Sequence, residues 1–440
     1  MFSDRRLWIM FILLVLPALS GVAFSSSPPA DPEEMPAENP TGVITLERAL
    51  ALGFSQNPEL ASCSWTVRAA EARRIQAGLL PNPELEAAIE NFGGDNGLEK
   101  FDGAETTLQI RQTFELGGKR AVRKQTAELE KETALQEYES RRLEVQAGII
   151  KSFWDVIAAQ EDCAIAGEIS AVAADAYQVA AERVKSGKVA PIEEIQAQVT
   201  MATARIDHEQ AERMLETARK RLAATWGRAR PEFEKAVADL ATPAPPPPLG
   251  SLTAEMIRNP DIVRWDTEEE IQRMRIRMAD AERIPDLTVA AGPRYFNESD
   301  DTAFVMSLSL PVPVFDRNQG ATREARSDLA GIRLSRKAAI LKAENDLGEA
   351  YQTLTASFST AESLATTAIP AAETAFSAAR EGYREGKINY IAVLETRRAY
   401  VEVRRQYVSA IADYHKSKAD IERLIGREIH EPPSSVNLPR

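Results

Sequence analysis

One stretch near the middle of the chain changes abruptly from a strand-like pattern to a helix-like pattern. Over residues 303–312 apolar side chains alternate with small or polar ones, and the apolar set is Phe304, Met306, Leu308, Leu310 and Val312. A period of two indicates a strand with one apolar face. Two prolines, Pro311 and Pro313, end this pattern. From Gly320 onward the apolar residues have helical spacing for about 65 residues.

The same change occurs earlier, where the alternating residues 105–114 are followed by a helical pattern that starts at Lys119. Residues 84–92 also alternate, and a glycine- and aspartate-rich loop separates the two strands, which indicates a hairpin. In the second stretch, residues 286–295 precede the strand, with a short turn between them. The sequence therefore predicts two β-hairpins, 84–114 and 286–312, and each continues directly into a long helix.

The two halves of the chain are tandem copies. Asn57-Pro58 is echoed by Asn259-Pro260, an offset of 202 residues, and Gly187-Lys188 by Gly386-Lys387, an offset of 199. The boundaries expected from this repeat are a signal peptide at 1–23, a flexible leader at 24–44, a first repeat at 45–228, a proline-rich linker at 229–250, a second repeat at 251–428 and a disordered tail at 429–440.

Each long helix turns back at a glycine. The first helix pattern runs from Lys119 to about Lys185, roughly 100 Å at 1.5 Å per residue, and then reaches Gly187. Pro370 lies inside the second helix and is expected to kink it. The two helical hairpins place their tips far from the strands, where they either close a tube, dock a partner or simply reverse the chain.

The strands are long enough to cross a bilayer as tilted strands, and aromatic residues gather at their ends. The alternative is an ordinary four-stranded sheet covered by a helix, but no helix in the pattern is free to cover it. In a membrane, four strands cannot stand alone, because open edges leave backbone donors unpaired in lipid. Several copies of the chain must then complete one barrel, which predicts a symmetric homo-oligomer.

The polar face of the first hairpin carries Glu84, Glu86 and Glu90, with Arg111 beside them. If the strands form a barrel, these residues line its lumen, and we expect a mouth that favours cations. The alternative is a solvated strand face with no selective role.

Composition and motifs argue against several classes of function. The net charge of −13 disfavours a nucleic-acid partner. The three histidines are scattered singly, and no nucleophile elbow, phosphate-binding loop or metal-ligand spacing is present, so the sequence predicts no enzyme, no cofactor and no metal site. Arg5 and Arg6 before an apolar run of moderate length, with small residues at Gly21–Ala23, indicate a secretory signal.

Four segments together resemble the TolC family of outer-membrane efflux channels, in its cation-efflux, CzcC-like branch. They are LERALALGFSQNPEL at 46–60, LGGKR at 116–120, LSLPVPVFDRNQG at 308–320, and the run from Gly382 to Gly426 that begins GYREGKINYIAVLETRR. The resemblance implies an α+β fold of mostly long helices: a trimeric β-barrel with four strands per protomer in the outer membrane, continuous with a periplasmic α-helical barrel.

The resemblance also implies an exit duct for metal cations or other small toxic solutes. Its partners are a periplasmic adaptor, an inner-membrane pump of the resistance-nodulation-division type and the outer-membrane lipid. Adaptor contact and gate fall at Gly187, Lys188, Gly386 and Lys387, and Glu395 supplies an acidic ring where the family commonly has aspartate. Alternatives are a type I protein-secretion or multidrug duct of the same fold, or a periplasmic coiled-coil adaptor without a pore.

Overall fold

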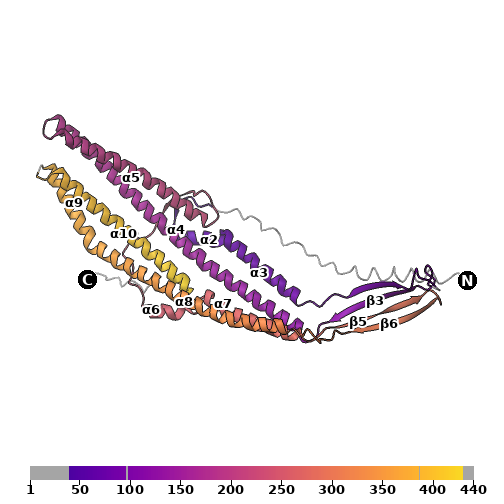
Figure 1. Ribbon diagram of the computed structural model, residues 1–440. Coiled ribbons are helices and arrows are strands. Elements are labelled where there is room, and N and C mark those ends of the chain that lie inside the picture. Colours follow the sequence, from indigo (N-terminus) through magenta and orange to yellow (C-terminus); the bar gives the residue numbers. More distant parts are fainter. Residues whose placement is uncertain (1–38, 96–97, 386, 430–440) are drawn as a thin grey trace. The chain divides into compact units, whose positions relative to one another are not determined.

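The computed structural model describes residues 39–95, 98–385 and 387–429. Long helices are joined at one end to a four-stranded sheet (Figure 1). The helices are α2 (Leu46–Gln56), α3 (Pro58–Ala77), α4 (Lys119–Lys185), α5 (Pro191–Ala224), α6 (Leu249–Met256), α7 (Pro260–Ala281), α8 (Gln319–Ser363), α9 (Ile369–Arg384) and α10 (Tyr390–Ile425), with a π-helical segment η2 (Leu364–Ala368). The strands are β1 (Gly42–Ile44), β2 (Glu84–Glu90), β3 (Glu105–Phe114), β4 (Phe233–Ala236), β5 (Leu287–Phe296) and β6 (Asp301–Ser309).

The two predicted hairpins form one antiparallel sheet in the order β2-β3-β5-β6. Strand β3 has the predicted bounds, but the predicted strand at 303–312 is wrong at its end, because β6 stops at Ser309. Pro311 and Pro313 have no N–H to donate to a ladder, so pairing ends before them. Strand β2 likewise ends at Glu90 instead of residue 92, and β5 is shifted by one residue to 287–296.

The two hairpins meet where β3 crosses β5, and one glycine allows the crossing. A Cβ on Gly292 would lie 1.9 Å from the carbonyl oxygen of Leu108 and 2.6 Å from the Cα of Gln109. Both of these are backbone atoms, so no side-chain rotation can relieve the clash. Gly292 therefore holds the two repeats in register within a single sheet.

The long helices follow the sequence pattern closely. Helix α4 has the predicted bounds Lys119–Lys185. The second long helix is divided into α8 and α9 by η2, which ends directly before the first turn of α9, where Pro370 lies. Because Pro370 has no N–H and its ring crowds the preceding turn, a wider turn forms there. Among the described residues, no helix is both long and apolar enough to cross a membrane.

The tandem repeat is visible in how each half begins. Asn57 and Asn259 both cap the helix that follows them, by accepting hydrogen bonds from backbone N–H groups. Their side-chain amides donate in turn to the end of the last helix of the same repeat, Asn57 to Thr225 O at 2.8 Å and Asn259 to Arg423 O at 2.6 Å. The same two-sided cap therefore closes both repeats.

The core lies around these caps, where α2, α4, α5 and α10 converge. Its largest fully buried side chains include Phe153, Trp226 and Ile411. A smaller cluster around Leu347, Leu354 and Ile421 belongs to the second repeat. Outside these clusters the long helices bury mainly alanines, such as Ala173 and Ala197, so they pack closely along narrow contact lines.

Two predicted connecting segments are more ordered than expected. The leader at 24–44 contains β1, which pairs in parallel with β4 inside the linker at 229–250, and α6 already begins at Leu249. The linker is held on α10, because Tyr407 Oη donates to Leu240 O and Tyr414 Oη donates to Ala244 O, both at 2.8 Å. Such long-range pairing leaves no local signature in a proline-rich sequence.

The ends of the chain lie mostly outside the described residues. The predicted signal peptide at 1–23 and most of the predicted tail belong to this part. The predicted tail begins at residue 429, but Ile429 packs against the second hydrophobic cluster and its N–H donates to Glu422 at 2.9 Å.

Replacing Gly292 with alanine is expected to destabilise the sheet, because the new Cβ would overlap backbone atoms of β3. The measurement is the unfolding temperature of the purified protein in detergent. Gly348→Ala is the matched control: it lies in α8, where an added Cβ meets nothing within 4 Å. It should stabilise the helix by about 0.5–1 kcal/mol. Equal unfolding temperatures for the two variants would contradict this role of Gly292.

Candidate functional site

The four-stranded sheet has one polar face. Strand alternation and cross-strand register place on it five acids and two arginines, namely Glu84, Glu86, Glu90, Glu105, Asp301, Arg111 and Arg294. The net charge of this face is therefore −3 per chain. The four residues predicted to line a lumen all lie on this face, and Glu105 and Asp301 are additions from the register.

Ion pairs organise these charges. Arg111 pairs with Glu86, to which Gln109 also donates at 2.9 Å. Arg294 bridges the two hairpins, because it bonds Glu105 at 2.8 Å and Glu90 at 3.3 Å. Within the described part of the chain Glu84 forms no ion pair, so it is a free carboxylate at the end of the sheet nearest the helices.

The opposite face of the sheet is apolar and uncovered. Phe304 is 88% exposed, and Leu85 and Met306 are each 73% exposed. Side chains of this size are rarely left open to water over a whole sheet face. The sheet is thus built to have an apolar medium on one side and water on the other.

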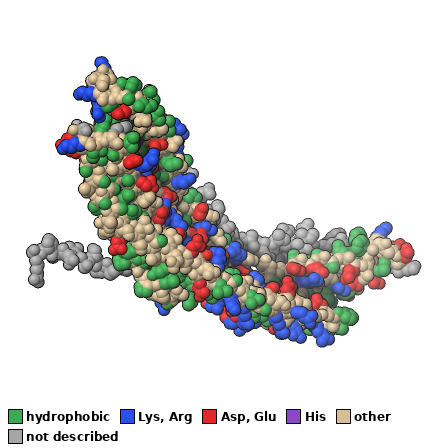
Figure 2. All heavy atoms as spheres, turned by 60° about the vertical axis from the view of Figure 1, so that its left-hand side comes forward, with side chains coloured by type: hydrophobic (Ala, Val, Ile, Leu, Met, Phe, Trp, Pro, Cys, Tyr) green, Lys and Arg blue, Asp and Glu red, His purple; other side chains and the backbone are tan. Residues whose placement is uncertain are grey.

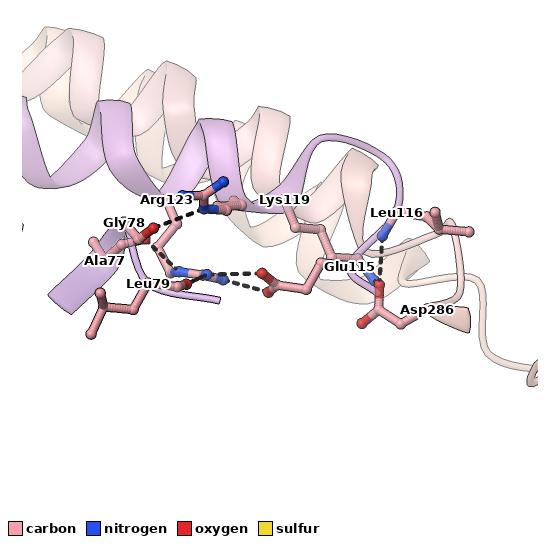
Figure 3. A network of polar contacts seen from close by, with 9 residues as sticks. Ala77, Gly78, Leu79, Glu115, Leu116, Lys119, Arg123 and Asp286 are labelled. Carbon is pink, nitrogen blue, oxygen red and sulfur yellow. Dashed lines mark hydrogen bonds and ion pairs between the residues drawn. The ribbon is translucent and has the colours of Figure 1, made fainter. Parts of the chain in front are cut away.

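The first strand-to-helix junction is a network of polar contacts (Figure 3). Gly117 and Gly118 both have positive φ, 69° and 76°, which turns the chain from β3 into α4. The loop is then fixed to the start of β5, because Asp286 accepts from the N–H of Leu116 at 3.0 Å and from Lys119 at 2.7 Å. The LGGKR segment is therefore a turn with its own anchor.

Arg123 ties three elements together at this junction. It donates to both carboxylate oxygens of Glu115, at 2.6 and 3.0 Å, and to the carbonyls of Ala77 and Leu79 at the end of α3 (Figure 3). Ala77 is the last residue of α3 and Leu79 follows the helix, so no later helical turn supplies an N–H to either carbonyl. The planar guanidinium satisfies carbonyls and carboxylate at once, which an ammonium group cannot do.

The contacts at the junction lower the pKa of two carboxyl groups, Glu115 and Asp286. The hydrogen bond and charge of Arg123 hold the pKa of Glu115 below its usual range despite partial burial. Burial by itself raises the pKa of Asp286, but the hydrogen bonds from Lys119 and Leu116 outweigh it, and the pKa is lowered. Both groups are therefore carboxylates at neutral pH.

The second junction uses different residues for the same task. Asn318, with a positive φ of 56°, starts α8 after β6. Its side-chain amide donates to Ala279 O near the end of α7 and to Glu282, both at 2.8 Å. Each junction thus binds the end of the helix that precedes its hairpin.

The predicted tip residues lie on separate turns. Gly187 has a φ of 71°, and Lys188 N–H donates back to Arg183 O at 2.9 Å, which closes the turn between α4 and α5. Gly386 lies outside the described residues. Lys387 beside it pairs with Glu385 at 2.6 Å, and Glu395 is exposed on the second turn of α10. The guanidinium of Arg183 lies 5.1 Å from the ring centre of Tyr383, so the two tips are in contact.

A series of contacts that the sequence did not reveal joins the two helical hairpins. Going toward the tips, α4 and α10 are linked by the ion pairs Lys151–Asp420, Asp155–Lys416, Asp162–Arg405 and Glu168–Arg404. The buried Arg397 then donates to Ile169 O at 2.7 Å. On α4 one lysine is followed toward the tip by three acids, and on α10 one aspartate is followed by three bases. Only the pairing of α4 with α10, which lie far apart in sequence, shows that these charges match.

The family model for outer membrane efflux proteins matches residues 50–228 and 253–427, which are the two repeats. The chain belongs to the outer membrane efflux protein family. It is 32% identical over 314 residues to the cobalt-zinc-cadmium resistance protein CzcC of Cupriavidus metallidurans, covering 70% of this chain and 73% of the relative. It is 26% identical to the nickel-cobalt-cadmium resistance protein NccC of Alcaligenes xylosoxydans xylosoxydans, over 64% of this chain and 63% of the relative.

The fold of this efflux protein is similar to that of the Campylobacter jejuni CmeC outer membrane channel, with a TM-score of 0.72 at 16% identity over 87% of this chain and 85% of that one. Family membership confirms the predicted outer-membrane location with a periplasmic helical part, and a transport channel in place of an enzyme. It also excludes the alternative of a periplasmic adaptor without a pore.

Replacing Glu115 with glutamine is expected to lower the free energy of unfolding by about 2 kcal/mol, because Arg123 loses a charged, doubly hydrogen-bonded partner. Arg123→Lys should have a similar effect, since lysine keeps the charge but not the fork. Arg205→Lys is the control: Arg205 meets Glu209 at 3.3 Å on an exposed helix face and should hardly matter. Chemical denaturation of the purified protein measures all three.

The junction should also be sensitive to acid. Glu115 and Asp286 have lowered pKa values in the folded protein, so their stabilisation is complete at neutral pH and is lost as pH falls below about 4. Unfolding temperatures measured from about pH 6 down to about pH 3 should fall more in the wild type than in Glu115→Gln. Parallel pH curves for the two proteins would contradict this contribution.

Proposed function

We propose that three copies of this chain form one exit duct of a tripartite efflux system. The observation that supports assembly is the sheet itself: β2 and β6 are open edge strands, and one face of the sheet is apolar and exposed. Open edges are not tolerated in lipid, so copies must join β6 of one chain to β2 of the next. The polar face of the sheet then lines a water-filled lumen, and the apolar face contacts lipid.

The cargo we propose is metal cations. The printed names of the relatives CzcC and NccC assign them to resistance against cobalt, zinc, cadmium and nickel. The polar sheet face favours cations as well, because its net charge is −3 per chain and Glu84 remains unpaired. A ring of such faces attracts cations and repels anions at the mouth of the duct.

The remaining partners in this proposal are a periplasmic adaptor and an inner-membrane pump of the resistance-nodulation-division type, which contact the helical tips. Lys188 and Lys387 lie on the two tip turns, and Glu395 is exposed close by on α10. In this proposal, opening separates α9 and α10 from α4 and α5, which breaks the contacts from Lys151–Asp420 to Arg183–Tyr383.

Reversal potentials in planar bilayers test the selectivity. The wild-type channel should prefer potassium over chloride under a salt gradient, and Glu84→Gln should weaken this preference because it removes the unpaired carboxylate. Glu232→Gln is the matched control, since Glu232 is an exposed acid beside β4 and away from the four-stranded sheet. Anion preference in the wild type would overturn the cation assignment.

The cargo is tested in cells. Deleting the gene should lower tolerance to cobalt, zinc or cadmium, and the intact gene should restore it. Unchanged metal tolerance together with a lost secreted protein would instead favour the type I secretion alternative. Unchanged metal tolerance with raised drug sensitivity would favour multidrug efflux.

A further inference from the structure

The helix ends that adjoin the sheet differ in charge from the rest of the chain. Residues 71–83, 115–125, 273–286 and 316–327 contain 13 Lys and Arg against 7 Asp and Glu, a net charge of +6 within a chain of net charge −13. Figure 2 shows lysine and arginine side chains gathered over the ends of α7 and α8 next to the sheet. An acidic protein therefore carries a basic band at one level.

Part of this band is not used for internal contacts. Six of its members are exposed and form neither an ion pair nor a side-chain hydrogen bond in the described part of the chain. We call them the basic collar, and they are Arg73, Lys124, Arg275, Arg317, Arg323 and Arg326. The other basic residues of the band include Lys119 and Arg123, which hold the junction. The collar charges are thus available to an external anion.

An exposed apolar segment lies directly beside the collar. Phe315 is 93% exposed, Val312 77% and Leu80 65%, and they precede or follow collar residues by a few positions. Val312 and Phe315 follow the end of β6, and Leu80 precedes the start of β2, so all three lie just outside the strands at the end of the sheet that adjoins the helices. A surface that changes from apolar to basic over one or two helical turns matches the boundary between hydrocarbon and phosphate in a bilayer.

We infer that the basic collar binds the phosphate-bearing headgroups of anionic phospholipids in the leaflet that faces the periplasm. This inference rests on the proposed function only in that the sheet crosses the outer membrane. The occupant is a lipid because the positive charges lie next to an apolar belt: headgroup and acyl chains then contact collar and belt together. Charge complementarity also offsets the repulsion between an anionic leaflet and the acidic remainder of the chain.

The test compares lipid nanodiscs of phosphatidylcholine alone with nanodiscs that also contain phosphatidylglycerol. The full chain should unfold at a higher temperature with phosphatidylglycerol, and high salt should remove the difference. The triple variant R317Q/R323Q/R326Q should lose at least half of the gain. R213Q/R221Q/R258Q is the control, because it removes three exposed charges on α5 and before α7, and it should keep the gain.

Two further results decide the interpretation. The variant R317K/R323K/R326K keeps the charges and should keep the gain, and native mass spectrometry should detect phosphatidylglycerol retained by the wild type and lost from the glutamine variant. No lipid dependence in the wild type, or equal loss in the collar and control variants, would overturn the inference. It would also be overturned if the collar variant changed ion selectivity and not lipid binding, since the collar would then face the lumen. Cation preference in pure phosphatidylcholine bilayers tests the proposed function separately.

Discussion

The structure depends on the junctions at which a strand continues into a long helix, because the backbone groups there need other hydrogen-bond partners. In β3 the bonds go to neighbouring strands, whereas in α4 they go to the same helix, and at the change both sets are incomplete. Gly117 and Gly118 provide the turn, and Arg123 binds Glu115 together with the exposed carbonyls of α3. Because this region sets the direction in which a helix of 67 residues leaves the sheet, small errors in it would become large displacements at the tip.

The two repeats reach the same architecture by unequal means. The first junction uses an arginine that binds a carboxylate and two backbone carbonyls, and the second uses Asn318, which binds one backbone carbonyl and the Glu282 carboxylate. At the other end of each repeat, Asn57 and Asn259 form matching caps. The two repeats therefore use the same residue type and contacts where each repeat closes, but different residues where each repeat meets the sheet. The two hairpins are joined by the ladder between β3 and β5, and the backbones approach closely at Gly292, which explains why so small a residue stands there.

Local patterns predicted the features that are local in origin. The bounds of β3 and α4 follow from periodicity and glycine turns, and the correspondence of the two repeats follows from the Asn-Pro pairs that precede α3 and α7. The missed features involve residues far apart in the chain. Strands β1 and β4 pair across 191 to 192 positions, Arg294 reaches Glu90 across 204, and Tyr407 holds a linker that looks flexible by composition. Polar residues on the first hairpin could be assigned to one face, but Glu105 is added by the register of β2 with β3, and Asp301 by the way in which the two hairpins meet.

The contacts between α4 and α10 have a mechanical consequence. Their partners are spaced along both helices, from Lys151–Asp420 to Glu168–Arg404, in one antiparallel register. A sliding movement by less than a full turn would carry every acid away from its base at once, so the resistance to shear adds up over the whole length. Peeling from the tip breaks one contact at a time. The two helical hairpins therefore resist sliding along their common axis, and they separate most easily by bending apart from their tips.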